Sequence, residues 1–255
     1  MSEDDKTTWF GFQKIPVREK AEQVAGVFHS VASQYDIMND VMSLGTHRLM
    51  KQVAVEYTVA RPGHCILDLA GGTGDLACRL SPIVGDDGQV VLCDINDSML
   101  THGRNRLLNN GISNNVTYVQ ADAEVLPFPD STFNAITIGF GLRNFTDKQV
   151  AINASKRVLK PGGKLVILEF SRPENPIVRN LYDSYSRLWP EVGRFITGDR
   201  KSYQYLVESI RMHPPQKELC RMLSDAGYEQ VEYHNILNGV AAIHVGRKVS
   251  DNACV

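Results

Sequence analysis

The segment Cys65-Ile66-Leu67-Asp68-Leu69-Ala70-Gly71-Gly72-Thr73-Gly74-Asp75 decides the fold of this chain. A short apolar run leads into a glycine-rich turn, and residues of helical period follow it. This pattern predicts a buried strand, a tight turn and the start of a helix, in which Gly71 and Gly72 let the backbone approach a ligand closely. We therefore expect a ligand site at the end of this strand.

A second strand end indicates that the ligand is a nucleoside. Twenty residues after Gly74, the apolar run 90–93 ends in Asp94. A carboxylate at this place bonds the two ribose hydroxyls of an adenosine in dinucleotide-binding folds. Two neighbouring strand ends are therefore expected to bracket one nucleoside.

The glycine turn by itself leaves two classes of cofactor open. Gly72 to Ala77 also satisfies G-x-G-x-x-A, the fingerprint of a dinucleotide whose pyrophosphate lies at a helix N-terminus. Asp75 would place a negative charge in the first turn of that helix, where the pyrophosphate would otherwise lie. Because a carboxylate there suits the cationic methionine moiety of S-adenosylmethionine, we favour the methyl donor.

The third predicted strand, 116–120, ends in Ala121-Asp122-Ala123-Glu124. Methyltransferases often place an acid followed by a small residue at this strand end. Asp122 would accept a hydrogen bond from the adenine amino group, and Ala123 would let a backbone N–H approach the ring. The alternative is that Asp122 only caps a short helix.

The rest of the chain predicts the surrounding fold. Short apolar runs alternate with segments of helical period, which is typical of βαβ units and a mostly parallel sheet. We expect strands at 65–69, 89–94, 116–120, 133–138, 164–170, 230–235 and 240–247, and helices at 75–83, 97–109, 147–159 and 215–226. Because a short link joins the last two strands, they should pair antiparallel. The prediction is an α/β protein with a Rossmann-like class I methyltransferase sheet of seven mostly parallel strands, an antiparallel C-terminal hairpin and a helical cover.

One domain over residues 1–255 is expected, because no internal repeat or long linker interrupts the pattern. Its predicted parts are an N-terminal helical cover (1–62), a cofactor-binding core (63–170), a helical insertion (171–214), a C-terminal helix and hairpin (215–248) and a tail (249–255).

Composition excludes several classes of protein. A chain of 255 residues with 43% hydrophobic and 22% charged residues is typical of an ordinary globular protein. Its net charge of -2 supplies no positive field for nucleic acid. The acidic N-terminus is unlike a signal peptide, and no apolar run is long enough for a transmembrane helix. The five cysteines form no C-x-x-C pair, so no metal site is expected. We expect a cytoplasmic protein with at most a peripheral contact at the inner face of the membrane.

Several motifs resemble those of the ubiquinone/menaquinone biosynthesis C-methyltransferases over nearly the whole chain. They are 10–13, 27–40, Ser43 with His47, Gly139-Phe140-Gly141-Leu142-Arg143-Asn144, 157–163, 169–171 and 203–211. Two positions depart from the family pattern. Met50 stands where Trp is usual, and Gly139 stands where bacterial relatives carry a Ser that is a suggested cofactor contact.

The resemblance implies S-adenosylmethionine as the methyl donor and no metal. It carries over Thr73, Asp94, Asp122 and Ala123 as contacts for the donor, beside the glycines of the turn. The implied reaction is C-methylation of a reduced polyprenylated quinone ring: demethylmenaquinol, a methoxy-polyprenyl-benzoquinol, or both. Two alternatives stay open: a methyltransferase of this fold for another phenol or lipid, and a non-catalytic member that acts as an assembly partner. A homodimer or a complex of quinone-biosynthesis proteins also stays open.

Ring methylation needs electron density at the carbon, which comes from loss of the neighbouring phenolic proton. A phenol with a pKa near 10 is mostly protonated at neutral pH, so the site must assist. We assign Arg143 as a fixed cation that stabilises the developing phenolate, with a bound water taking the proton. Asn144 and Tyr35 would orient the water or the hydroxyl. The alternatives are a surface salt bridge for Arg143 and a core aromatic for Tyr35.

The polyprenyl tail needs an apolar channel, and segments 24–35 and 177–196 could line it. In the second segment, Leu181, Leu188, Trp189 and Phe195 belong to an apolar series. Such stripes are more often core than channel. If one face of the series is exposed, it would contact the membrane that holds the substrate.

Overall fold

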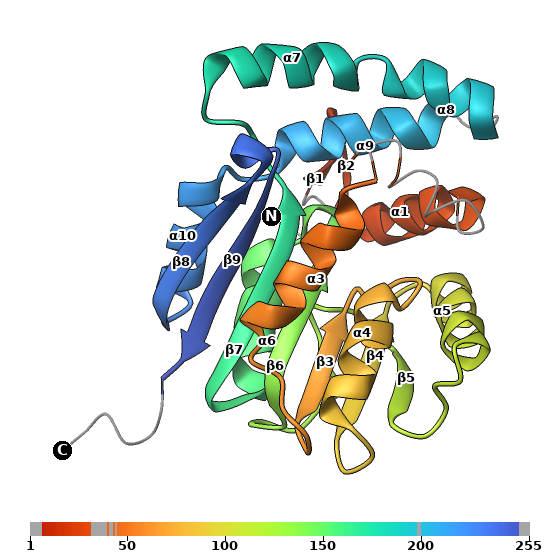
Figure 1. The fold of residues 1–255 in the computed structure, drawn as a ribbon. Coiled ribbons are helices and arrows are strands. Elements are labelled where there is room, and N and C mark those ends of the chain that lie inside the picture. Colours follow the sequence, from red (N-terminus) through yellow and green to blue (C-terminus); the bar gives the residue numbers. More distant parts are fainter. Residues whose placement is uncertain (1–6, 32–39, 41–42, 44, 198–199, 250–255) are drawn as a thin grey trace.

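The computed structural model describes residues 7–31, 40, 43, 45–197 and 200–249, with a seven-stranded sheet at its centre (Figure 1). The strand order is β5-β4-β3-β6-β7-β9-β8. The strands are β3 (Cys65–Leu69), β4 (Gln89–Asp94), β5 (Val116–Gln120), β6 (Phe133–Gly139), β7 (Leu159–Phe170), β8 (Tyr228–Ile236) and β9 (Ala241–Lys248). Strands β3 to β7 pair parallel, whereas β9 pairs antiparallel with both β7 and β8. The predicted mostly parallel sheet with an antiparallel C-terminal hairpin is confirmed.

Helices cover both faces of the sheet, which is why its central strands are continuous apolar runs. The first face carries α3 (His47–Tyr57), α4 (Asp75–Val84) and α5 (Asp97–Asn109), and the second carries α6 (Lys148–Val158) and α10 (Gln216–Asp225). Along β3, Ile66 packs into the core on the α4 side, whereas Leu67 and Leu69 pack into the core on the other side. Because successive side chains of a strand point to opposite faces of the sheet, β3 contributes to the cores on both faces.

Short polar side chains begin two of these helices. Asn96 accepts from the backbone N–H of Met99 at the start of α5, and Asp147 accepts from those of Gln149 and Val150 at the start of α6. Each satisfies N–H groups that have no partner within the helix. Asn96 follows the end of β4, and Asp147 lies in the connection after β6, so both caps lie at the carboxyl edge of the parallel strands.

A third group of helices lies across the carboxyl ends of the parallel strands (Figure 1). It comprises α1 (Val17–Val31), α7 (Pro176–Ser186), α8 (Trp189–Thr197) and α9 (Arg200–Met212). Trp189 and Tyr203 are fully buried in the core that joins this layer to Phe140 and Phe170 at the sheet. Helices α8 and α9 approach so closely that a Cβ on Gly193 would lie 2.3 Å from the ring of Tyr203. Among the described residues, no helix is both long and apolar enough to cross a membrane.

Two elements differ from the prediction. The N-terminal cover, expected to be helical, begins with a hairpin of β1 (Thr7–Phe10) and β2 (Gln13–Pro16), which was missed because each strand has only four residues. Strand β7 begins at Leu159 rather than 164, directly after α6 and through a Pro-Gly-Gly stretch that reads as a turn. Two short 3₁₀ helices, η3 (Leu142–Asn144) and η4 (Leu237–Gly239), were also not predicted.

Candidate active site

The turn after β3 is built around the carboxylate of Asp94 at the end of β4. Asp94 Oδ2 accepts from the backbone N–H of Gly72 at 2.9 Å, and Oδ1 accepts from that of Asn96 at 2.9 Å. Burial raises the pKa of Asp94 to about 6, although these hydrogen bonds oppose the rise. The carboxylate is therefore ionised at neutral pH and fixed at the mouth of the turn.

Glycine is required in this turn because other chain segments lie against it. A Cβ on Gly71 would lie 2.3 Å from Leu92 Cδ1, and one on Gly141 would lie 2.6 Å from the Cβ of Ala70. Ala70 and Phe140, at the ends of β3 and β6, adopt φ values of 52° and 60°. Left-handed backbone at non-glycine residues costs conformational free energy, and such residues are found most often at functional sites.

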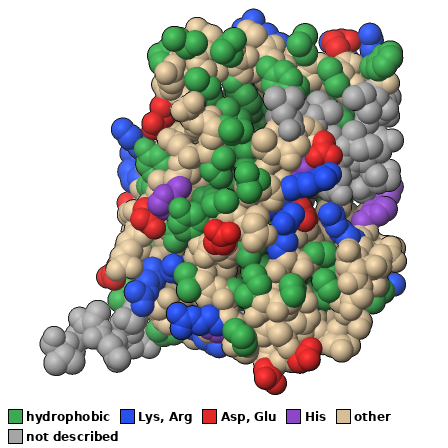
Figure 2. All heavy atoms as spheres, in the orientation of Figure 1, with side chains coloured by type: hydrophobic (Ala, Val, Ile, Leu, Met, Phe, Trp, Pro, Cys, Tyr) green, Lys and Arg blue, Asp and Glu red, His purple; other side chains and the backbone are tan. Residues whose placement is uncertain are grey.

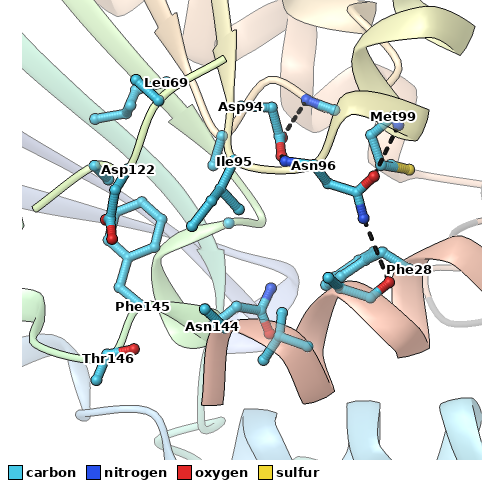
Figure 3. A pocket seen from close by; sticks show the side chains of 18 of the residues that line it. Phe28, Leu69, Asp94, Ile95, Asn96, Met99, Asp122, Asn144, Phe145 and Thr146 are labelled. Carbon is cyan, nitrogen blue, oxygen red and sulfur yellow. Dashed lines mark hydrogen bonds between the residues drawn. The ribbon is translucent and has the colours of Figure 1, made fainter. Parts of the chain in front are cut away.

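One pocket opens where these strand ends face α1. Figure 3 shows Asp94 and Asn96 on one side of it, Asp122 and Phe145 on the other, and Asn144 next to α1. Asn96 Nδ2 donates to the backbone carbonyl of Ala25 at 3.3 Å, which ties α1 to the strand end. The pocket is therefore closed on one side by the N-terminal cover.

Most of the predicted cofactor contacts converge on this pocket. Gly72, Asp94, Asp122 and Ala123 line it, as does the predicted catalytic residue Asn144. Gly71 and Thr73 instead line a small adjoining cavity with Lys51, Asp68 and Gly139. Tyr35, which was also predicted to take part in catalysis, lies outside the described residues.

Asp122 fits both of its expected roles. Its Oδ1 accepts from the backbone N–H of Glu124 at 2.9 Å, which is the local cap of a turn. Asp122 nevertheless lines the pocket next to the buried Ala123, so a carboxylate oxygen and a small residue do meet there. The two interpretations are compatible, because a carboxylate has several acceptor positions.

Asp75 lines the same small cavity as Gly71 and Thr73, but its carboxylate is already paired with cations of the chain. Its carboxylate is 2.8 Å from Lys51 Nζ, 3.3 Å from Arg79 Nε and 3.8 Å from Arg106 Nη2. Burial tends to raise its pKa, but the three cations prevail and lower it to about 2. The charge of Asp75 is thus largely balanced within the protein, which sequence reasoning did not foresee, and its contact with the methionine moiety stays a prediction.

Arg143 lies behind the pocket wall. Its Nη1 is 2.7 Å from Glu169 Oε1, both side chains are fully buried, and its backbone N–H donates to Glu169 Oε2 at 3.1 Å. The same Nη1 donates to the carbonyl of Phe140, and the guanidinium lies over the ring of Phe170. The alternative of a surface salt bridge is wrong, because the pair is buried. Sequence reasoning did not foresee that Glu169 would balance the charge of Arg143.

Tyr205 on α9 is a site residue that sequence reasoning missed. Its hydroxyl donates to Oδ1 of Asn144 at 3.0 Å, and burial raises its pKa well above the usual range. Its ring stacks on Phe10 of β1, with 4.3 Å between centroids. The family motif 203–211 includes Tyr205, but it does not assign the residue to the site, because its partner Asn144 lies 61 residues away in the chain.

Apolar side chains also form part of the pocket wall; Phe28 belongs to the segment 24–35 that was predicted to line an apolar channel, whereas Ile95, Met99 and Phe145 were missed. Ile95 is 42% exposed directly after Asp94, and an apolar side chain beside a strand-end carboxylate was the available signal. Together these side chains can enclose a flat aromatic base.

The two departures from the family pattern have structural explanations. Met50 is 1% exposed in the core, where an unbranched thioether side chain can fill the space that the family residue would occupy. A Cβ on Gly139 would lie 2.7 Å from Leu76 Cδ1, so a Ser there would require Leu76 to move. Among the described residues, no three His, Cys, Asp or Glu side chains are grouped as a metal site would need.

Solved structures with the same architecture define the class of protein. The chain is similar to a SAM-dependent methyltransferase from Aquifex aeolicus (TM-score 0.58, 19% identity, 83% of this chain and 98% of that one). It is also similar to the [4+2]-cyclase SpnF (TM-score 0.67, 19% identity, 90% and 97%). At such identities the likeness shows the fold alone, which is the α/β fold of class I methyltransferases.

Sequence comparisons go further than the fold. Residues 16–248 match the model of the ubiE/COQ5 methyltransferase family. The chain is 59% identical over 250 residues to the ubiquinone/menaquinone biosynthesis C-methyltransferase UbiE of Shewanella baltica, covering 97% of this chain and all of that one. It is 56% identical to the UbiE of Saccharophagus degradans, covering 96% and 99%. The chain therefore belongs to the ubiE/COQ5 methyltransferase family and is an S-adenosylmethionine-dependent C-methyltransferase.

Proposed function

We propose that this enzyme transfers the methyl group of S-adenosylmethionine to a ring carbon of a reduced polyprenylated quinone. The relatives that match 96% to 97% of this chain are named for ubiquinone/menaquinone biosynthesis. The observation that carries the proposal is one pocket that holds both a ribose-binding carboxylate, Asp94, and the amide of Asn144. The acceptor is demethylmenaquinol, a methoxy-polyprenyl-benzoquinol, or both.

The residues of the pocket fit the methyl donor. Asp94 would accept from the two ribose hydroxyls, and Asp122 would accept from the adenine amino group above the backbone of Ala123. Thr73 and Gly71, in the adjoining cavity, would face the methionine part. When bound, the donor supplies an electrophilic methyl group, and no metal is needed to activate it.

The phenolic oxygen of the acceptor would lie at Asn144. The Asn144 amide nitrogen is turned toward the pocket in Figure 3, because Oδ1 is held by Tyr205. An N–H donor fixed at that place stabilises negative charge that develops on the oxygen as its proton leaves. A bound water takes the proton, and Tyr35 orients the water or the hydroxyl.

Arg143 would act through its neighbours. Its positive charge is balanced by Glu169, whose Oε1 lies 2.7 Å from Arg143 Nη1. The ion pair therefore exerts a weaker electric field on the acceptor than a lone cation would. It would hold η3, and with it Asn144, against the end of β7 and next to Tyr205. Arg143 is thus proposed as a positioning residue, which refines its assignment as a direct cation.

The helical layer over the site supports a peripheral contact with the membrane. Leu181, Leu188 and Phe195 are 67%, 58% and 91% exposed, whereas Trp189 of the same series is buried. The apolar series therefore divides into a core part and an outward part. We propose that the outward part lies on the inner face of the membrane that holds the prenylated acceptor, with the enzyme otherwise in the cytoplasm.

Mass spectrometry of quinol products tests the reaction. A short-chain demethylmenaquinol and a methoxy-prenyl-benzoquinol, both kept reduced, are incubated with the enzyme and S-adenosylmethionine. The expected result is the gain of one methyl on ring carbon. If neither quinol changes while S-adenosylhomocysteine binds tightly, the acceptor is another phenol or lipid, or the chain is a non-catalytic assembly partner. A panel of phenolic acceptors separates those two alternatives.

A further inference from the structure

A second cavity lies between α7 and α9 and shares no lining residue with the Asp94 pocket. Its volume is about 270 Å³, and it is bounded by the segment that follows β7, by one side of α7 and by the end of α9. Its α7 residues belong to the segment 177–196 that was considered for the prenyl tail, but the charged side chains of this cavity have no role in the proposed methyl transfer. The ligand of this cavity must therefore be inferred from the side chains that line it.

The charged side chains of this cavity are mostly arginines. They are Arg172, Arg179, Arg187 and Arg211, with Asp183 as the one acid, which makes four positive charges against one negative. No lysine is among the lining residues. A cluster of guanidinium groups with a net charge of +3 favours an anion, and planar guanidinium groups suit phosphoryl and carboxylate oxygens in particular.

Three of these arginines are anchored through only part of their donors. Arg172 Nη2 donates to the carbonyl of Arg211 at 3.1 Å, and Arg179 Nε donates to that of Pro173 at 3.0 Å. Arg211 Nη2 is 3.4 Å from Ser186 Oγ and 4.0 Å from Asp183. Because a guanidinium has five N–H groups, each arginine keeps donors for a ligand while its position is held.

Two buried hydroxyls also line the cavity. Ser171 Oγ and Tyr182 OH are buried and have no hydrogen-bond partner among the described residues. Burial raises the pKa of Tyr182 far above its usual range, so its hydroxyl stays protonated and can donate. A buried polar group without a partner is costly, which indicates that these two hydroxyls have a partner supplied from outside the chain.

The ligand that fits these donors is a phosphoryl group. Phosphate oxygens only accept, they point in several directions, and they match arginines and hydroxyls that converge from three segments. The residues of α7 that face the cavity are spaced three and four apart: Arg179, Tyr182, Asp183 and Ser186. The opposite side of the same helix carries Ile177 and Leu181, which are 71% and 67% exposed.

This division of α7 identifies the source of the phosphoryl group. An apolar stripe that faces outward, with arginines below it, is typical of a helix that lies in a bilayer interface at the level of the lipid phosphates. Figure 2 shows hydrophobic side chains along the edge of the molecule that α7 and α8 form. Anionic headgroups and the basic cavity are also complementary in charge.

We propose that the cavity between α7 and α9 binds the phosphoryl headgroup of an anionic phospholipid when α7 contacts the membrane. The inference rests on the peripheral contact given under the proposed function and adds a specific lipid site to it. Arg179 and Arg187 bring the headgroup to the opening, and Ser171 and Tyr182 donate to it inside.

Vesicle flotation tests the site with the full-length enzyme. Vesicles of phosphatidylcholine alone are compared with vesicles that also contain phosphatidylglycerol. Arg179→Gln/Arg187→Gln is expected to lower binding to the anionic vesicles by about thirtyfold. The matched control Lys217→Gln/Arg221→Gln removes the same charge from exposed positions of α10 and should stay within about twofold of wild type.

The hydroxyls separate a lipid site from simple surface charge. Ser171→Ala/Tyr182→Phe keeps the net charge and is expected to lower binding to phosphatidylglycerol vesicles by about tenfold. Wild-type binding by this double variant, with an unchanged melting temperature, would overturn the proposal. A free anion would be the ligand of the cavity if inorganic phosphate binds tightly in calorimetry while Ser171→Ala/Tyr182→Phe binds vesicles as the wild type does. That result would overturn the proposed lipid site.

Methyl transfer to a short-chain quinol keeps the two proposals distinct. The cavity variants should retain this activity within about twofold, since their residues lie outside the Asp94 pocket. If the wild type methylates no quinol yet binds anionic vesicles through Ser171 and Tyr182, the proposed reaction fails and the lipid site stands.

Discussion

The hydroxyl of Tyr205 donates to Oδ1 of Asn144 across 3.0 Å and so joins helix α9 to the wall of the cofactor pocket. Burial raises the pKa of Tyr205 well above its usual range, so the hydroxyl stays protonated and donates to the amide oxygen. The bond then leaves the Asn144 amide nitrogen for the pocket (Figure 3). The orientation of a predicted catalytic residue is thus set by a helix of the cover.

Tyr205→Phe is expected to lower kcat by about tenfold while S-adenosylhomocysteine affinity stays within about twofold. The ring keeps its stack on Phe10, but one hydrogen bond of about 1 kcal/mol is lost and the amide of Asn144 can rotate. Steady-state kinetics and calorimetry measure the two effects. Tyr233→Phe, at a tyrosine on β8 outside the pocket, is the control. A parallel loss of cofactor affinity would contradict the positioning role.

Cofactor affinity is expected to depend on pH through Asp94. Burial raises the pKa of this carboxyl to about 6, and only the ionised form accepts from both ribose hydroxyls. Affinity for S-adenosylhomocysteine should therefore be constant above the pKa and fall as pH drops below about 6, by at most tenfold per pH unit. Calorimetry between pH about 5 and about 7.5 measures it. Asp94→Asn should bind S-adenosylhomocysteine weakly, with an affinity that does not change with pH. A wild-type affinity that does not change with pH would refute the assignment of the pH dependence to Asp94.

Arg143→Met is expected to destabilise the fold by about 3–5 kcal/mol, because it leaves the buried carboxylate of Glu169 without its cation. Urea unfolding measures the change in the free energy of unfolding. Arg143→Met/Glu169→Gln removes the orphaned charge and should recover part of the loss. If the double variant is no more stable than the single one, the ion pair is not the cause.

Gly141→Ala is expected to lower stability by about 1–3 kcal/mol and to weaken cofactor binding, because its Cβ would lie 2.6 Å from the Cβ of Ala70 in the pocket wall. Gly26→Ala on α1 is a control, since a Cβ there meets nothing within 4 Å. The control should be neutral or stabilising by up to about 1 kcal/mol. Thermal unfolding and calorimetry compare the two, and equal effects would mean that the close approach at Gly141 is relieved elsewhere.

Much of the sheet and of the pocket at its carboxyl edge could be predicted from the sequence. The apolar runs of the central strands and the glycine turn are local signals, and strand-end carboxylates follow their strands directly. Gly72, Asp94 and Asp122 therefore lie in the pocket as expected, because the carboxyl ends of parallel strands meet at one edge. The short N-terminal hairpin was missed, since two strands of four residues each are too short to carry a clear periodic signal.

The catalytic end of the site depends on pairs that are distant in the chain. Arg143 meets Glu169 at 26 residues' separation, and Asn144 meets Tyr205 at 61. The three cations around Asp75 likewise include Lys51, which is 24 residues away. No spacing rule connects such residues, because they meet only after the helices have packed against the strand ends.

The sequence by itself determined the alternation of strands and helices, the glycine turn and the acids at the strand ends, since each depends on residues within a few positions of one another. Only the tertiary structure decided that Arg143 turns inward to Glu169, that Tyr205 orients Asn144 and that the charge of Asp75 is already balanced. The physical reason is that the field at a charged group depends on which distant groups packing brings within a few ångströms of it.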